Sequence, residues 1–161
     1  MADFKFNIEW DGLRELQQEF KTMNKRFKLI MLDEMDKIGL TCEEYAKKLS
    51  PRDSKELEDS IHSTQATIEG GSFVVYVGTN MKYAAYVHEL NNVRPVGDKY
   101  ERGVKLEGYY IGGRGQRTRD KPSEKGFKPG RKFLQRAVIL TDQHFEKAME
   151  RALERLLEGG S

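Results

Sequence analysis

The clearest structural signal in the chain comes from two adjoining runs, Phe73-Val74-Val75-Tyr76-Val77-Gly78-Thr79-Asn80 and Tyr83-Ala84-Ala85-Tyr86-Val87-His88-Glu89-Leu90. β-Branched and aromatic side chains suit a pleated, half-buried surface, so the first run predicts a strand that breaks at Gly78. In the second run, apolar residues recur at spacings of three and four, which predicts a short helix with one apolar face. The residues on that face are Tyr83, Tyr86, Val87 and Leu90. A strand followed directly by a helix favours a fold that combines both elements.

Helices are predicted before this strand. Apolar residues recur every three or four positions from Leu13 onward, which predicts a helix over about 11–22 and a longer one over about 24–49. Gly39 lies inside the longer helix, where it costs roughly 1 kcal/mol relative to alanine. The residue before a proline is driven out of the helical conformation, so the long helix is expected to end at Ser50-Pro51.

A small antiparallel sheet is predicted around the run at 73–77. Residues 60–68 alternate loosely between polar and apolar, and Gly70-Gly71 is a good hairpin signal. Segments 60–68 and 73–77 are therefore expected to pair across a turn. Residues 3–8 also alternate, which predicts a further short strand or an arm.

The helical spacing resumes at Lys132 and fades at Gly159-Gly160-Ser161, which predicts a C-terminal helix. The chain is long enough for one domain with one core, and we assign residues 1–161 to a single domain. The predicted fold class is α+β. A long N-terminal helix and a C-terminal helix pack on a small antiparallel β-sheet that carries a long basic loop insertion.

The composition is that of a charged, water-soluble protein. Of the 161 residues, 37% are hydrophobic and 34% are charged, which predicts a well-solvated surface and a modest core. The N-terminus lacks a basic region followed by an apolar run, and no apolar run approaches the ~20 residues that cross a bilayer, so neither a signal peptide nor a membrane span is expected. Cys42 is the single cysteine, which excludes an intrachain disulfide and fits an intracellular origin. Its helical spacing indicates a small buried hydrophobe.

Residues 91–131 differ in character from the rest of the chain and are predicted to be a flexible basic loop insertion. Residues 91–132 hold eight of the fifteen glycines and three of the four prolines. They carry twelve Lys and Arg against five Asp and Glu, a net charge of +7, whereas the rest of the chain sums to −5 and the whole to +2. Only Val104–Ile111 is expected to form strand there. A loop this long in a compact domain is usually functional or disordered.

The candidate site residues are cations of this insertion. They are Arg114, Arg117, Arg119, Lys121, Lys125 and Lys128. Cations near aromatic rings such as Phe127 suit contact with nucleic-acid phosphates and bases. The same charges suit docking to a protein partner or to a neighbouring subunit, and a solvated loop is the third alternative. Docking is favoured, and on that hypothesis deletion of residues 112–126 is expected to leave the fold intact.

No catalytic, cofactor or metal site is predicted. The three histidines, His62, His88 and His144, are not spaced as metal ligands, and the chain has no C-x-x-C or H-E-x-x-H pattern. His88 and Glu89 are adjacent on a predicted helix, where side chains one position apart do not face each other. Gly112–Gly115 lacks the Gly-Lys-Ser/Thr ending of a phosphate-binding loop and is expected to precede no helix. We therefore expect a protein without enzymatic activity.

Three motifs, taken in order, resemble those of a phage family. The first is Ser50-Pro51-Arg52-Asp53-Ser54-Lys55-Glu56-Leu57-Glu58-Asp59-Ser60-Ile61, the second is the strand with the Tyr83–Leu90 run, and the third is Lys132-Phe133-Leu134-Gln135-Arg136-Ala137. Their order and spacing resemble the gene-product-ten-like neck or tail-completion family of long-tailed double-stranded DNA bacteriophages. The chain departs from that pattern at Lys55, where glycine is usual, and at His88-Glu89-Leu90-Asn91, which replaces Glu-aromatic-Gly.

The resemblance implies a structural protein of the virion. It implies a homo-oligomeric ring, a hexamer to match a tail, that joins tail to head at the head–tail junction or the head-proximal tail end. The implied partners are other phage neck and tail proteins. Synthesis would take place in the host bacterial cytoplasm, and no cofactor, membrane or family catalytic residue is implied. Two alternatives stay open: a tail terminator at the same junction, and a nucleic-acid-binding module that uses residues 91–132, which includes contact with packaged DNA.

Overall fold

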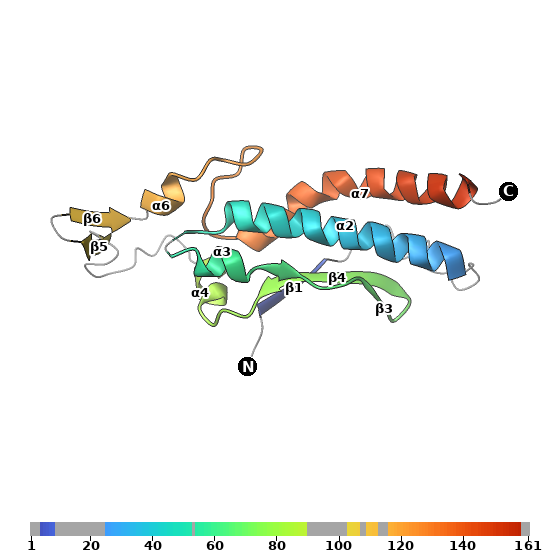
Figure 1. The fold of residues 1–161 in the computed structure, drawn as a ribbon, viewed down its shortest axis with the longest axis horizontal. Helices are drawn as coiled ribbons and strands as arrows, with labels where there is room; N and C mark the ends of the chain where they lie inside the picture. The colour runs from blue at the N-terminus through green and yellow to red at the C-terminus, as the bar shows by residue number, and fades with distance from the viewer. Residues whose placement is uncertain are drawn as a thin grey trace.

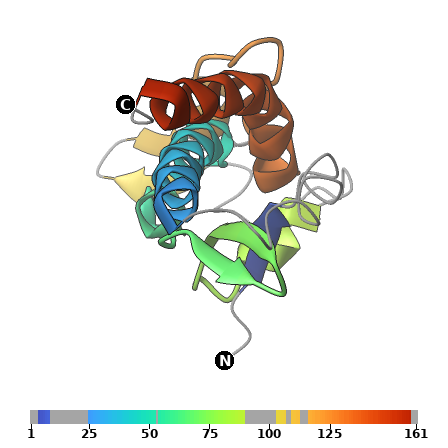
Figure 2. The ribbon, with the colours of Figure 1, turned by 90° about the vertical axis from the view of Figure 1, so that its right-hand side faces the viewer.

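Two long helices form the frame of the molecule. The computed structural model describes residues 4–8, 25–52, 54–89, 103–106, 109–112 and 116–158. α2 (Lys25–Leu49) and α7 (Phe133–Glu158) lie side by side along the long axis (Figure 1). They run antiparallel, because Arg26 at the start of α2 donates to the carbonyl of Arg155 near the end of α7, at an Nη2–O distance of 3.2 Å. The sheet lies on the other side of α2, so α2 is the middle layer (Figure 2).

The predicted bounds of both long helices are confirmed. α2 ends at Leu49, one residue before Ser50-Pro51, because the residue before a proline is disfavoured in the helical conformation. α7 begins at Phe133, where the apolar periodicity resumes. The helix predicted over 11–22 lies outside the described residues.

β4 (Ser72–Thr79) is the central strand of the main sheet, and the other strands described there pair with it antiparallel. β1 (Phe4–Ile8) lies along one edge. β2 (His62–Ser63) and β3 (Thr67–Glu69) lie along the other. The aligned residues are Phe4 with Thr79, Ile8 with Val75, His62 with Gly78, and Thr67 with Val74.

The predicted hairpin is confirmed at the turn between β3 and β4. Gly70 and Gly71 have positive φ angles of 56° and 85°, which glycine adopts without steric cost. The single strand predicted over 60–68 is instead two short strands. Between them, the backbone N of Ala66 donates to Oδ1 of Asp36 on α2 at 2.6 Å, so the chain leaves the sheet to contact the helix.

Five shorter elements complete the part of the chain that is described. They are α3 (Glu56–Ser60), α4 (Ala84–Glu89), the hairpin of β5 (Gly103–Leu106) and β6 (Tyr109–Gly112), and α6 (Gln116–Arg119). α4 confirms the helix predicted after the central strand, and the β5–β6 hairpin overlaps the predicted strand Val104–Ile111. The prediction that no helix follows Gly112–Gly115 is wrong, since α6 begins at Gln116. With four residues, α6 has few aligned peptide dipoles with which to attract a phosphate.

Two apolar clusters fill the space between the layers. One joins the C-terminal half of α2 to the start of α7 and includes Leu49, Ile61 and Phe133. The other joins the N-terminal half of α2 to the sheet and to the end of α7, and includes Met35 and Phe73. All five side chains are buried. The predicted α+β fold, with two long helices packed on a small antiparallel sheet, is therefore confirmed.

α2 approaches the sheet closely at Gly39. A Cβ added there would lie 2.6 Å from Cγ2 of Val75 and 3.4 Å from Cβ of Ser63. A contact of 2.6 Å is far inside the separation at which two carbon atoms attract each other. The absence of a side chain at Gly39 lets α2 pack closely on β4, and this packing offsets the poor helix propensity of glycine.

A buried carboxylate holds α2 and α7 together. The side chain of Glu34 is fully buried, and its oxygens lie 2.9 Å from Arg151, 3.0 Å from Arg155 and 3.0 Å from Lys37. Burial alone would raise the pKa of Glu34, but hydrogen bonds from these three cations outweigh burial and lower the pKa. The carboxylate is therefore charged and compensated from both helices.

Candidate functional site in the basic insertion

Residues 116–132 of the basic insertion lie against the carboxyl end of α2 (Figure 1); we call them the clamp segment. The backbone N of Gly130 donates to the carbonyl of Leu49 at 2.8 Å, and the backbone N of Arg52 donates to Oγ1 of Thr118 at 2.9 Å. The last carbonyls of a helix lack partners within the helix. The clamp segment therefore supplies a donor to the last carbonyl of α2 and an acceptor to the residue that follows Pro51.

Lys121 makes the most buried of these contacts, with a residue exposure of 7%. Its Nζ donates to the carbonyls of Lys47 at 2.7 Å and Ser50 at 2.8 Å, and to Oε2 of Glu58 at 3.3 Å. An ammonium group has three donors, so all are used within the chain, and its charge also suits the negative end of a helix. Burial lowers the pKa of Lys121, and the charge of Glu58 opposes that effect. The ammonium of Lys121 is therefore directed at groups within the chain, and docking through the insertion stays a prediction.

This contact changes the expectation for the deletion of residues 112–126. That deletion would remove both Thr118 and Lys121, so the carbonyls of Lys47 and Ser50 would lose a charged donor. An unpaired buried carbonyl is destabilising. The deletion is therefore expected to weaken the fold, contrary to the sequence-based expectation.

Lys125 and Lys128 differ in their contacts. Nζ of Lys125 donates to the hydroxyl of Tyr45 at 2.7 Å and lies 5.1 Å from the centre of that ring, within cation–π range. The same hydroxyl lies 2.9 Å from Nε2 of His144 on α7. Lys128 accepts a hydrogen bond from Arg136 through its backbone carbonyl, at 2.7 Å, and is exposed.

Four cations of the clamp segment form a surface that we call the basic end. They are Arg117, Arg119, Lys128 and Arg131. Arg119, Lys128 and Arg131 are exposed and Arg117 is half-buried. The contacts of Thr118 and Gly130 with the end of α2 bring both halves of this set to the same end of that helix. Arg114 lies outside the described residues.

A second contact, made by His88, Glu89 and Lys132, joins the clamp segment to α4. Nδ1 of His88 lies 2.8 Å from Oε1 of Glu89, and the ammonium of Lys132 hydrogen-bonds the other oxygen. The expectation that His88 and Glu89 do not face each other is wrong, because α4 ends at Glu89 and a terminal side chain can fold back beside its neighbour. Burial lowers the pKa of His88, with Glu89 opposing. The ring packs edge-on against Phe133, with 5.3 Å between ring centres.

Other kinds of site receive no support from the described residues. No group of three or more His, Cys, Asp or Glu side chains among them is placed to hold a metal ion. Burial raises the pKa of the Cys42 thiol to about 11, so a nucleophilic thiolate does not form near neutral pH. None of the described helices combines the length and apolar character that a bilayer span requires.

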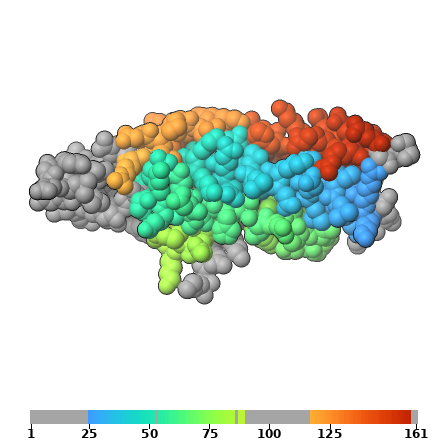
Figure 3. Space-filling view, in the orientation of Figure 1, coloured from blue at the N-terminus to red at the C-terminus, as the bar shows by residue number. Residues whose placement is uncertain are grey.

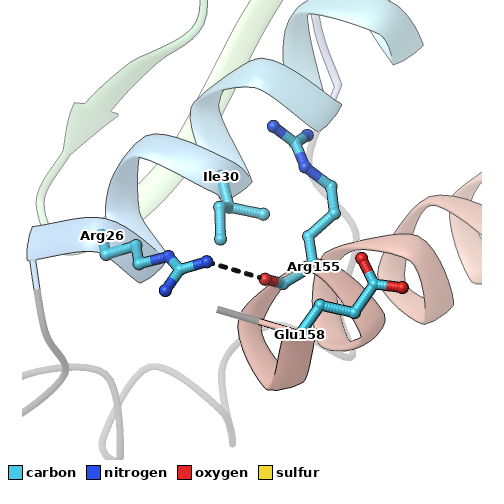
Figure 4. A pocket seen from close by; sticks show the side chains of 4 residues that line it. All are labelled: Arg26, Ile30, Arg155 and Glu158. Atoms are coloured by element: carbon cyan, nitrogen blue, oxygen red, sulfur yellow. Dashed lines mark hydrogen bonds between the residues drawn. The ribbon is translucent and has the colours of Figure 1, made fainter. Parts of the chain in front are cut away.

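A shallow hollow of about 350 Å³ lies between the first turn of α2 and the last turn of α7 (Figure 4). Its lining residues are Arg26, Ile30, Arg155 and Glu158. Arg26 donates to the backbone of Arg155, and Arg155 donates to Glu34 at 3.0 Å. Both arginines thus take part in the contact between the two helices, and we assign the hollow a structural role.

The comparison with protein families matches the central part of this fold. Residues 14–89 match the model of a family described as "Bacteriophage HK97-gp10, putative tail-component". The chain carries an HK97-gp10-like region. This confirms the family resemblance seen in the motifs. The HK97-gp10-like region spans α2, α3, the strands β2 to β4, and α4, whereas the clamp segment and α7 follow it. Searches of curated proteins and of solved structures gave no match.

The departure from the family pattern at Lys55 has a structural consequence. Lys55 precedes α3 and has φ of 72° and ψ of −10°, which is the left-handed conformation. Glycine adopts this conformation freely, whereas it costs other residues about 1–2 kcal/mol. The backbone thus has the conformation that the usual glycine favours, although the side chain here is lysine.

Proposed function

We propose that this protein is a non-enzymatic structural component of a phage particle, and that it forms a ring at the head–tail junction or the head-proximal tail end, where it joins tail to head. The observation that carries the proposal is the match of residues 14–89 to a tail-component family. The order of the three motifs, which continues past that region to Ala137, supports the placement at the neck.

The shape and surface of the chain suit repeated contact with copies of itself. The molecule is elongated, with α2 and α7 along its length (Figure 1). Large apolar side chains lie exposed on both helices. Among them, Leu40 on α2 has an exposed fraction of 60%, and Leu157 on α7 has an exposed fraction of 78%. Head-to-tail contacts around a rotation axis close into a ring. Each lasting interface is expected to bury well over ~1,000 Å².

A nonsense mutation in the phage gene tests this function. We expect filled heads and separate tails to accumulate, and joined particles to return when the protein is supplied from a plasmid. Gold-labelled antibody on the wild-type intermediates then separates the two junction roles, because a neck protein is found on free heads and a tail terminator on free tails. Normal yields of joined, infectious particles from the mutant would contradict the proposal, as would absence of the protein from purified virions.

Nucleic-acid binding through the insertion is the second candidate function, supported by the exposed cations of the basic end. We rank it below docking because Lys121 and Lys125 direct their ammonium groups at groups within the chain. A DNA-binding module would bind duplex DNA with log K falling linearly as log salt rises, with a slope that reports the number of phosphate contacts. Fluorescence anisotropy at 50 and 200 mM salt measures this slope. If the protein does not bind duplex DNA at 50 mM salt, nucleic-acid binding is excluded as its function.

A further inference from the structure

α7 presents a mixed acidic and apolar face away from the core. Its residues lie seven, eleven, fourteen, fifteen and eighteen positions after the first, and at 3.6 residues per turn these positions share one side of the helix. They are Ile139, Glu146, Glu150, Leu153, Glu154 and Leu157, and we call them the outer face. All six are exposed, and the three apolar members reach 51%, 54% and 78%. Figure 3 shows the C-terminal part of α7 on the surface.

The carboxylates of the outer face lack compensation from the described residues. Glu146, Glu150 and Glu154 follow one another at intervals of four, where like charges repel on a helix. Among residues 25–52, 54–89 and 116–158, none makes a salt bridge or hydrogen bond to these three side chains. By contrast, Glu34 on the inner side of the helix pair is matched by three cations. Within the part of the chain that the structure describes, the outer face is thus an unpartnered helix face whose six members carry one sign of charge.

The basic end has the opposite charge and a different position on the molecule. Arg119, Lys128 and Arg131 are exposed near the carboxyl end of α2, whereas the acidic part of the outer face lies toward the C-terminal end of α7 (Figure 1). In one molecule these surfaces belong to opposite halves of the long axis, so they are suited to meet between molecules. Complementary surfaces of this kind steer association and fix register.

We propose that the outer face of α7 in one copy receives the basic end of a second copy of this chain. The inference rests on the proposed ring, for which it names the subunit contact. Carboxylates of the outer face pair with guanidinium and ammonium groups of the basic end, while Leu153 and Leu157 are covered at the same time. Because the two surfaces differ, the contact is heterologous, and each copy uses both of its surfaces as the ring closes.

Charge reversal on each side separately, followed by mixing, tests the contact. One variant is E150K/E154K on the outer face, and the other is K128E/R131E on the basic end. We expect each variant alone to associate about 100-fold more weakly than the wild type at low salt, because like charges then meet across the contact. In an equimolar mixture, every contact again joins opposite charges. The mixture is therefore expected to recover association to within about tenfold of the wild type. Sedimentation velocity at 50 mM salt measures all four samples.

The matched controls change the same charges elsewhere on the chain. E56K/D59K on α3 and K25E/K28E on α2 alter exposed side chains outside both surfaces, and both are expected to associate like the wild type. The outer-face variant is expected to fold, because Lys replaces Glu near a helix C-terminus, where a cation is favourable; circular dichroism checks this.

Three outcomes would overturn the proposed contact. They are a wild type that stays monomeric at low salt and high concentration, reversal variants that assemble normally, and a mixture that stays dissociated. Assembly of the reversal variants would leave the proposed role at the head–tail junction standing, because the nonsense mutant tests the joining of heads to tails independently. Normal self-assembly of E150K/E154K together with its exclusion from phage particles would instead assign the outer face to another tail protein.

Discussion

Replacing Lys121 with methionine tests whether one buried ammonium holds the clamp segment on α2. The change keeps most of the apolar stem but removes the donor to the carbonyls of Lys47 and Ser50 and the cation beside Glu58. The carbonyl of Lys47 keeps the Ser50 hydroxyl as a donor at 2.9 Å, whereas the Ser50 carbonyl loses its charged donor. A buried carbonyl without a donor is destabilising by about 1–3 kcal/mol, and a hydrogen bond to a charged group such as Glu58 contributes about 1.5–3 kcal/mol, so we expect a loss of about 3 kcal/mol in the free energy of unfolding. With an m-value of about 2 kcal/mol/M, the urea midpoint would fall by about 1.5 M.

Lys128→Met is the control for this change, because it removes the same group from an exposed residue of the same segment. Its free energy of unfolding is expected to stay within about 0.5 kcal/mol of the wild-type value. Trypsin provides a local measurement in native buffer: cleavage after Arg119 and Arg131 should be faster in Lys121→Met than in the control. Equal urea midpoints and equal cleavage rates for the two variants would refute the role given to Lys121.

Substitutions at three further positions test a buried ion pair, a close contact and a backbone conformation by urea unfolding. Glu34→Gln should lose about 2 kcal/mol at pH 7, less than for a fully buried pair because both arginines of α7 are partly exposed. Hydrogen bonds from the three cations outweigh burial and hold the folded pKa of Glu34 below that of an unfolded glutamate. The carboxylate therefore stabilises the fold above the unfolded pKa, and the effect is lost as pH falls through the folded pKa; an equal loss at pH 3 would contradict this. Gly39→Ala should destabilise by about 1–3 kcal/mol because the added Cβ meets Val75, despite the better helix propensity; a more stable variant would contradict the close approach. Lys55→Gly should stabilise by up to about 1 kcal/mol by relieving a positive φ, whereas Lys55→Ala should not; equal effects of the two would count against strain at this position.

The parts of the fold that were predicted correctly are those with a local signal. α2 and α7 have an apolar stripe many turns long, and Pro51 marks where the first ends. Gly70-Gly71 fixes the hairpin because few other residues adopt its backbone angles. Glu34 gave no such signal. Its burial depends on Arg151 and Arg155, which lie more than a hundred residues away in the sequence.

The clamp segment was not predictable for the same reason. Lys121 is one of twelve basic residues in a glycine- and proline-rich stretch, and nothing in its spacing distinguishes it from Lys128. It is separated from Lys47 by 74 positions, so the contact follows from how the folded surfaces meet. The sequence shows that positive charge is concentrated in the insertion. It does not show which of these cations contact the end of α2 and which are exposed to solvent.

The clamp also bears on how a ring would form. A basic loop on a flexible tether would meet a neighbouring subunit at many angles, which favours irregular association. Here Thr118, Lys121 and Gly130 are bonded to the end of α2, and the segment passes directly into α7 at Phe133. The basic end and the outer face are therefore held on one frame. A head-to-tail contact then repeats with one fixed rotation, which is the condition for closing a ring. In the proposed ring, Lys121 would contribute to assembly without touching the partner, because it fixes the position from which the exposed cations act.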